Sequence, residues 1–210
     1  MIIAREGWSI VGVGAAVTVV LHWALGAAWA WPLWLVLFFL IQFFRDPPRE
    51  ISEAVGAIVS PAHGKVVAIE RMRDPYLDRD ALKVSIFMNV FSVHSNRIPM
   101  AGHIRGQWYH AGRFFNAALD KASRENERNA LWVQTPTGED IVVVQIAGLI
   151  ARRISCDIKH GERVTTGQRY GFIKFGSRVD VYLPLEADIA TRLGQWVLSG
   201  TDTIAYLRSR

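Results

Sequence analysis

Two runs of residues decide the fold of this chain: Leu82-Lys83-Val84-Ser85-Ile86-Phe87-Met88 and Ile141-Val142-Val143-Val144-Gln145-Ile146. Both are rich in β-branched and other apolar residues that favour extended strands, and both lie between turn-forming residues. Similar runs occupy 57–59, 65–69 and 130–135. Short strands that alternate with turns, with little helical periodicity between them, predict a mainly β domain, a small sandwich or flattened barrel.

Toward the C-terminus, the stretch from His160 to Phe175 is punctuated by glycine at turn spacing. This pattern is similar to the small flattened β-barrels that carry biotin or lipoate, a likeness of architecture that says nothing of function. Between the predicted strands, 115–126 is expected to form a short helix or an irregular loop. We therefore expect 46–210 to form one β domain.

The composition is different toward the N-terminus, where no Asp, Glu, Lys or Arg occurs from Gly7 to Phe44. This run is too long for the apolar part of a signal peptide. As one helix it would be nearly twice as long as a hydrocarbon core of about 30 Å. The break around 25–32 predicts two helices, 8–24 and 32–44, in a hairpin that spans or re-enters a membrane. A buried hairpin in a soluble core is the alternative.

The charges on either side of the hairpin predict its orientation. Arg5 precedes it, Arg45 and Arg49 follow it, and its turn carries no charge. The positive-inside tendency then places both ends of the hairpin, and the domain after it, on the cytoplasmic side of the cell membrane. We expect a membrane-anchoring hairpin at 1–45 and a separate β domain at 46–210.

Charge and cysteine content narrow the class of partner. The whole net charge of +5 belongs to residues 45–210, which favours contact with an anionic membrane surface. The sequence has no run of Lys and Arg and no nucleic-acid-binding motif, so a nucleic-acid partner is not expected. The single Cys156 excludes an internal disulfide, and the scattered histidines predict no metal site.

Several motifs in a fixed order carry a family resemblance. They are Phe44-Arg45-Asp46-Pro47, Ser60-Pro61-Ala62-His63-Gly64-Lys65-Val66, Ile86 to Arg97, Asn116 to Ala122, Asn126-Glu127-Arg128-Asn129, Gln145-Ile146-Ala147-Gly148, Ala151-Arg152-Arg153-Ile154 and Phe175-Gly176-Ser177. Along nearly its entire length the chain resembles the short-form (prokaryotic) branch of phosphatidylserine decarboxylase proenzymes. Any one of these motifs alone would be a weak signal.

The resemblance implies a lyase of phospholipid biosynthesis that is made as a zymogen. Family members cleave themselves at the Gly-Ser bond, here Gly176-Ser177, and turn the serine into a covalent pyruvoyl cofactor. The pyruvoyl group decarboxylates phosphatidylserine to phosphatidylethanolamine through a Schiff base. The products of cleavage would be a large chain, 1–176, and a small chain, 177–210, which stay together, and the family commonly forms homodimers.

The residue types at the junction suit this chemistry. Gly176 has no Cβ, so the backbone can adopt a strained conformation and the Ser177 Oγ can approach its carbonyl. The Ser177 Oγ serves first as nucleophile and then as leaving group, and it needs a base nearby. His94 matches the histidine that the family uses in decarboxylation, as proton donor. Arg97 and Asn96 are expected to bind substrate, although a surface salt bridge explains Arg97 equally well.

His63 departs from the family pattern. The family loop reads Pro-Ala-Asp-Gly, with the aspartate implicated in self-cleavage, whereas this chain reads Pro61-Ala62-His63-Gly64. In long-form relatives that aspartate works with a second histidine at the place held here by Arg97. Either His63 is the base for Ser177, or the substitution slows processing. We favour the second reading.

Two other classes of protein compete with this interpretation. A non-catalytic, membrane-tethered β-barrel module explains the hairpin and the glycine pattern equally well, but gives no reason for the bond before Ser177 to break. A serine hydrolase is disfavoured because no Gly-x-Ser-x-Gly elbow surrounds Ser177. Cleavage of the chain distinguishes the proenzyme from the non-catalytic module.

Overall fold

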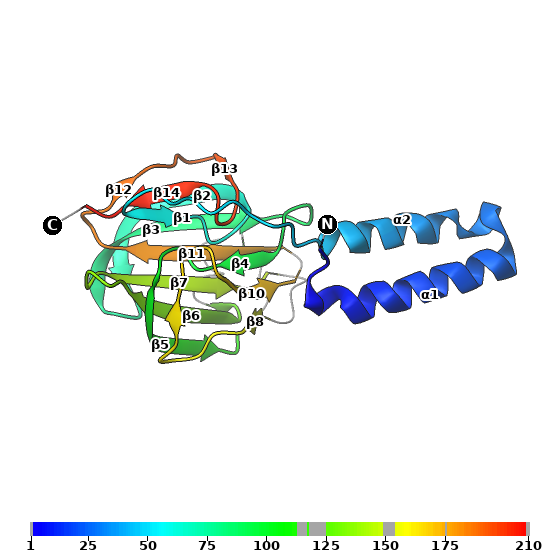
Figure 1. Cartoon of the computed structure of the whole chain (residues 1–210), viewed down its shortest axis with the longest axis horizontal. Coiled ribbons are helices and arrows are strands. Elements are labelled where there is room, and N and C mark those ends of the chain that lie inside the picture. The colour runs from blue at the N-terminus through cyan, green and yellow to red at the C-terminus, as the bar shows by residue number, and fades with distance from the viewer. Residues whose placement is uncertain (1, 113–116, 118–124, 149–153, 175, 209–210) are drawn as a thin grey trace. The chain divides into compact units, whose positions relative to one another are not determined.

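A computed structural model describes residues 2–112, 117, 125–148, 154–174 and 176–208 (Figure 1). The chain divides into two compact units, Met1–Pro48 and Arg49–Arg210, which are described separately. Most of 115–126, where a short helix or loop was expected, lies outside the described residues. The fold class is confirmed: the protein is mainly β, with a pair of helices before the strands.

The first unit is a helical hairpin. A short 3-10 turn, η1 (Arg5–Gly7), leads into α1 (Trp8–Leu25), and α2 (Ala27–Phe43) returns. Gly26 alone makes the reversal, with a φ of 80° that favours glycine. The predicted start of the second helix at residue 32 was therefore wrong. Pro32 lies inside α2, where its missing N–H leaves one carbonyl of the preceding turn without an intrahelical donor.

Short backbone contacts close the base of this hairpin. Ile3 and Arg45 form an antiparallel bridge, and the Ala4 N–H donates to the Phe44 carbonyl at 2.7 Å. Many apolar side chains of both helices are exposed, among them Trp23, 84% exposed. By length and composition, the segment Arg5–Leu25 could cross a membrane, whereas α2 is shorter.

The second unit is built on one large antiparallel sheet that curls into a half-barrel (Figure 1). Its order is β13-β2-β3-β11-β7-β6-β5-β9. The strands are β2 (Gly64–Asp74), β3 (Arg79–Met88), β5 (Gly102–His110), β6 (Arg128–Gln134), β7 (Asp140–Ile146), β9 (Arg163–Val164), β11 (Ser177–Leu183) and β13 (Trp196–Val197).

Two three-stranded sheets complete the unit. Their orders are β1-β14-β12 and β4-β10-β8. The strands are β1 (Ala57–Val59), β4 (Ser95–Arg97), β8 (Ile154–Cys156), β10 (Arg169–Ile173), β12 (Asp188–Ile189) and β14 (Thr203–Tyr206). The main core holds apolar side chains from all three sheets, as expected when period-2 patterns point one face of each strand inward.

Strand β11 lies at the centre of the large sheet, between β3 and β7, and every one of its residues is buried. Its alternate side chains contact two different clusters. Val179, Val181 and Leu183 belong to the main core, whereas Tyr182 belongs to a smaller apolar cluster on the other face. The register also sets Ser177 opposite Met88 of β3.

Candidate active site

The junction Gly176–Ser177 opens strand β11. Gly176 has a φ of 61°, in the left-handed region that favours glycine, and Ser177 is fully buried. Among the described residues, the Ser177 Oγ has no hydrogen-bond partner. An unsatisfied buried hydroxyl typically costs about 1–3 kcal/mol, so a group retained in this state is a candidate for chemistry.

Gly148 lies directly against the carbonyl of this junction. A Cβ placed on Gly148 would meet the Gly176 carbonyl oxygen at 1.7 Å and its carbon at 2.8 Å. Only a hydrogen fits between the two backbones. The sequence pattern includes Gly148 in a motif but predicts no role for it; the available signal is a glycine immediately beyond a buried apolar strand.

A chain of side-chain amides runs through the fold toward Met88, the partner of Ser177. Gln107 donates to Asn129 at 3.1 Å, Asn129 to Gln145 at 3.2 Å, and Gln145 to Asn96 at 2.9 Å. The Asn96 amide in turn lies 3.8 Å from the Met88 sulfur. Each amide uses its nitrogen as donor in the same direction, so the chain fixes the orientation of the buried members.

Asn96 is therefore engaged within the protein through both ends of its amide. Arg97, half-buried, donates from Nη1 to the Gly167 carbonyl at 2.9 Å. The predicted role of Asn96 and Arg97 in binding substrate stays a prediction. What the structure adds is that β4 carries both residues and pairs with β10, which ends shortly before the junction.

His94 immediately precedes β4 and is fully buried. Its ring packs against Phe172 with centroids 6.0 Å apart. Its carbonyl accepts the N–H of Ile173, four residues before Ser177, at 3.2 Å. The backbone thus ties the His94 segment to the strand that leads into the junction.

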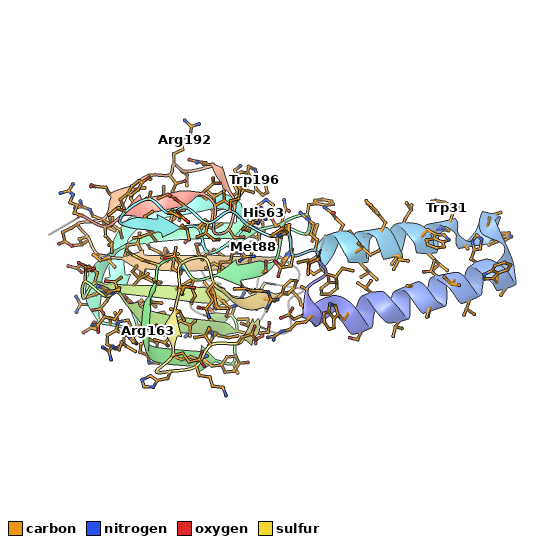
Figure 2. The ribbon with its side chains drawn as sticks, in the orientation of Figure 1. Trp31, His63, Met88, Arg163, Arg192 and Trp196 are labelled. Atoms are coloured by element: carbon orange, nitrogen blue, oxygen red, sulfur yellow. The ribbon has the colours of Figure 1, made fainter. Side chains whose placement is uncertain are left out.

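His63 is joined to the same segment. Its Nδ1 accepts the backbone N–H of Val93 at 3.0 Å, and its ring lies 6.1 Å from that of Trp196. With Nδ1 as acceptor, the neutral ring carries its proton on Nε2. Figure 2 shows His63, Met88 and Trp196 at one side of the domain. His63 and His94 are thus linked through Val93, whereas among the described residues the Ser177 Oγ forms no hydrogen bond with either imidazole.

The residues after Ser177 carry a buried ion pair that the sequence analysis missed. Arg178 Nε lies 2.9 Å from Asp180 Oδ1, and Nη2 donates to Oδ2 at 3.1 Å. Nη1 donates to the Ala117 carbonyl at 3.2 Å. Both side chains are at most 2% exposed. Burial raises the pKa of the neighbouring Tyr182 phenol well above its ordinary value, and the Asp180 charge raises it further.

Comparison with known proteins identifies the family of this chain. A family model described as phosphatidylserine decarboxylase matches residues 36–205. Proteins named phosphatidylserine decarboxylase proenzyme are 54% identical in Aromatoleum aromaticum and 55% identical in Ralstonia nicotianae, each over 98% of this chain and 96% of the relative. The Nitrosomonas europaea protein of the same name is 53% identical over 97% of this chain and 94% of its own length. This chain belongs to the phosphatidylserine decarboxylase family.

Proposed function

We propose that this chain is a proenzyme that cuts itself between Gly176 and Ser177 and then decarboxylates phosphatidylserine to phosphatidylethanolamine. One observation carries the proposal. The Ser177 Oγ is fully buried at the start of the central strand without a hydrogen-bond partner among the described residues. The carbonyl before it faces a glycine, Gly148, where no side chain fits.

The self-cleavage would proceed in balanced steps. The Ser177 Oγ attacks the Gly176 carbonyl carbon, the C–N bond breaks, and the hydroxyl proton passes to the freed amine of residue 177. Loss of the residue-177 Cα proton and of the ester oxygen then releases 1–176 as a carboxylate and leaves a double bond at residue 177. Water replaces the nitrogen, ammonia departs, and a ketone remains on the small chain, 177–210.

The surroundings of the junction fit this sequence of steps. Gly148 lets the Gly176 carbonyl pack directly against its backbone, a position that any side chain at 148 would block. Pairing of Ser177 with Met88 holds the nucleophile at the end of the central strand. The hydrogen bond from Arg178 Nη1 to the Ala117 carbonyl would tie the new end of the small chain to the large chain after the bond is cut, and Asp180 would hold the Arg178 guanidinium in place for it.

The same residues would serve the second reaction. The pyruvoyl group formed at position 177 would supply a ketone that binds the substrate amine and accepts the electrons left by CO2. His94 would move a proton from its imidazole, and its burial against Phe172 excludes water from that nitrogen. Arg97 would orient the substrate carboxylate or phosphate through its forked donors.

The setting would be the cytoplasmic face of the cell membrane, with the hairpin as anchor. The apolar segment Arg5–Leu25 supports an anchor. The positive charges around the hairpin support the orientation. A lipid substrate could then present its head group while its acyl chains stay in the bilayer. The chain would form homodimers, as members of the family commonly do.

His63 would affect the rate of the first reaction. Because its Nδ1 already accepts the Val93 N–H, the lone pair of the neutral ring is engaged. This arrangement supports the reading in which the substitution slows processing rather than the one in which His63 is the base for Ser177. The aspartate of the family loop could accept the same N–H and still have oxygen lone pairs to spare.

The test is to purify the full chain in detergent and to follow it by denaturing gel and intact mass, beside Ser177→Ala. We expect two fragments matching 1–176 and 177–210, the smaller with an α-keto end, and conversion of phosphatidylserine in mixed micelles. Ser177→Ala should stay whole and inactive. An uncut parental chain without decarboxylase activity after prolonged incubation would instead support the non-catalytic module.

A further inference from the structure

We propose that the catalytic end of the domain carries its own binding surface for an anionic lipid bilayer, separate from the hairpin. The surface, here called the lipid-facing patch, consists of Phe91, Leu193, Trp196 and Leu198 with Lys65 and Arg192. The inference rests on the proposed function for its lipid substrate. It concerns how the domain meets the bilayer.

The apolar members of the patch are unusually exposed for a folded domain. Phe91 is 65% exposed, Leu193 67%, Trp196 51% and Leu198 38%. Contiguous exposed apolar side chains on a soluble surface mark a binding site. Tryptophan in particular prefers the interface between membrane and water, where one part of its ring system is apolar and its N–H is hydrated.

Phe91 and Leu193 lie in two turns, both held by side-chain caps, whereas Trp196 lies in β13 and Leu198 follows that strand. Asn89 Oδ1 accepts the Phe91 N–H at 2.9 Å and closes the first turn. In the second, Gln195 Oε1 accepts the Arg192 N–H at 3.2 Å, and the Gly194 N–H donates to Val66 at 2.8 Å. The exposed side chains are therefore displayed on fixed backbone.

Sheet register places the patch at the cleavage end of the fold. Trp196 pairs with Lys65, Lys65 with Phe87, and Phe87 with Arg178, the second residue after the proposed cut. These four residues form one row across β13, β2, β3 and β11. Phe91 follows Met88, the last residue of β3, and so lies beyond this row. His63, with its ring 6.1 Å from that of Trp196, connects the patch to the His94 segment.

Charge decides which partner suits the patch. Lys65 pairs with Trp196, Arg192 directly precedes Leu193, and both cations are exposed. Figure 2 shows Arg192 and Trp196 in the same upper part of the domain. No Asp or Glu occurs from Ala190 to Thr201 or from Val84 to Asn96. The Asp202 carboxylate follows the first stretch and accepts the Leu198 N–H at 2.7 Å, so it offsets one of the two cations. Apolar side chains flanked by cations match a bilayer with anionic head groups better than they match a second copy of the same cationic patch.

The test uses the full chain in nanodiscs of phosphatidylcholine and phosphatidylserine. Cys156, the single cysteine, is replaced by serine, and an environment-sensitive dye is attached through Leu193→Cys. We expect the dye at 193 to be quenched by doxyl groups on the lipid chains. The control is the same dye at Thr137→Cys. Thr137 lies in the exposed turn between β6 and β7, at the opposite end of the sheet, and should stay unquenched.

A second measurement links the patch to activity. The ratio of the rate on bilayer phosphatidylserine to the rate on a monomeric short-chain form should fall about tenfold in Leu193→Ser, because one buried apolar side chain contributes about that factor. Val55→Ser, at a site 97% exposed and outside the patch, should leave the ratio as it is. Reversal of charge in Arg192→Glu should lower the ratio and weaken its dependence on salt.

Three outcomes separate the explanations. An unquenched dye at 193, with an unchanged ratio in Leu193→Ser, would overturn the inference. A dye at 193 already shielded in detergent, with a doubled particle mass and no quenching by lipid, would also overturn it and assign the patch to contact between copies. Quenching at 193 in a chain that neither cuts itself nor decarboxylates would uphold the lipid-facing patch and reject the proposed function.

Discussion

The two faces of strand β11 differ in a way that bears on the proposed reaction. One face carries Ser177 and the apolar residues of the main core, and there the Ser177 Oγ has no hydrogen-bond partner among the described residues. The other face carries Arg178 and Asp180, buried and paired with each other through two contacts. The same strand thus carries a serine hydroxyl, the proposed nucleophile, that forms no hydrogen bond with the described residues. It also carries two charged side chains that bind each other.

The two faces of β11 would therefore serve two different needs: reaction of the Ser177 hydroxyl, and retention of the strand after the bond before it is cut. A serine nucleophile must lose its proton as it attacks a carbonyl, and a hydroxyl that is not bound to another group stays available to a base. A strand whose N-terminal bond is to be cut needs other contacts to stay in place. The core face serves the first need, and on the charged face Arg178, which donates to the Ala117 carbonyl, serves the second. Mutations on the two faces should therefore affect different measurements.

The largest effect is expected from crowding the carbonyl on the reactive face. Gly148→Ala would place a methyl group 1.7 Å from the Gly176 oxygen, so one of the two backbones must move. Because angstrom-scale misplacement of reacting groups typically lowers rates about 100-fold, we expect self-cleavage to slow by at least that factor. The measurement is the fraction of uncut chain over time on a denaturing gel.

The control for this variant is Gly102→Ala. There the added methyl would meet the Gln134 oxygen at 2.3 Å, a comparable clash between β5 and β6, away from the junction. We expect it to lower thermal stability while cleavage continues. Equal slowing in both variants would mean that general destabilisation, rather than crowding of the Gly176 carbonyl, limits cleavage.

The charged face is tested by breaking its ion pair. Asp180→Ala would leave Arg178 buried beside no carboxylate, which typically lowers the free energy of unfolding by about 3–5 kcal/mol. The double variant Arg178→Met/Asp180→Leu should be less destabilised, because no charge is stranded. Both are compared by chemical denaturation in a Ser177→Ala background, so that every molecule is uncut. If Asp180→Ala lowered the free energy of unfolding by less than about 1 kcal/mol, this pair would contribute no more than an exposed surface pair does.

A smaller effect, in the opposite direction, is expected at His63. His63→Asp should speed self-cleavage several-fold, because a carboxylate can accept the Val93 N–H and further hydrogen bonds together. His160→Asp, at an exposed histidine, makes the same charge change as control. Slower cleavage in His63→Asp would refute the reading in which this substitution impairs processing.

The smallest effect concerns titration on the charged face. Burial, and then Asp180, hold the pKa of the Tyr182 phenol far above its ordinary value. Its contribution to stability is therefore present below about pH 10, the unfolded-state value, and is lost as the pH rises toward the folded-state pKa. Asp180→Asn should lower this pKa only in part, since burial remains. Absorbance of phenolate during alkaline titration measures it, with Tyr182→Phe identifying the signal.

The strands were the most predictable part of the fold. Runs such as 82–88 and 141–146 are dense in β-branched residues, and both became central strands, β3 and β7. The start of the second helix was less predictable. A proline usually marks the first turn of a helix, but here Gly26 alone reverses the chain and α2 begins at Ala27.

The proposed site could be recognised in the sequence as a motif, but the residues that surround it could not. Gly176 and Ser177 are readable as a motif, whereas the clash that defines Gly148 depends on two backbones meeting in space. Arg178 and Asp180 have the spacing that places them on one face of a strand. Composition alone, however, gives no reason to expect charges in the centre of a sheet. The amide chain through Gln145 likewise depends on contacts between distant segments.

The central place of β11 has a consequence for the lifetime of the enzyme. The segment after the proposed cut supplies β11 between β3 and β7, β13 at the edge of the same sheet, and β12 and β14 in a second sheet. Such a fragment cannot be withdrawn without unfolding the domain. A molecule whose position 177 is chemically damaged could therefore not be reloaded with a fresh small chain. Each copy would work until that one residue fails, and only new synthesis would replace it.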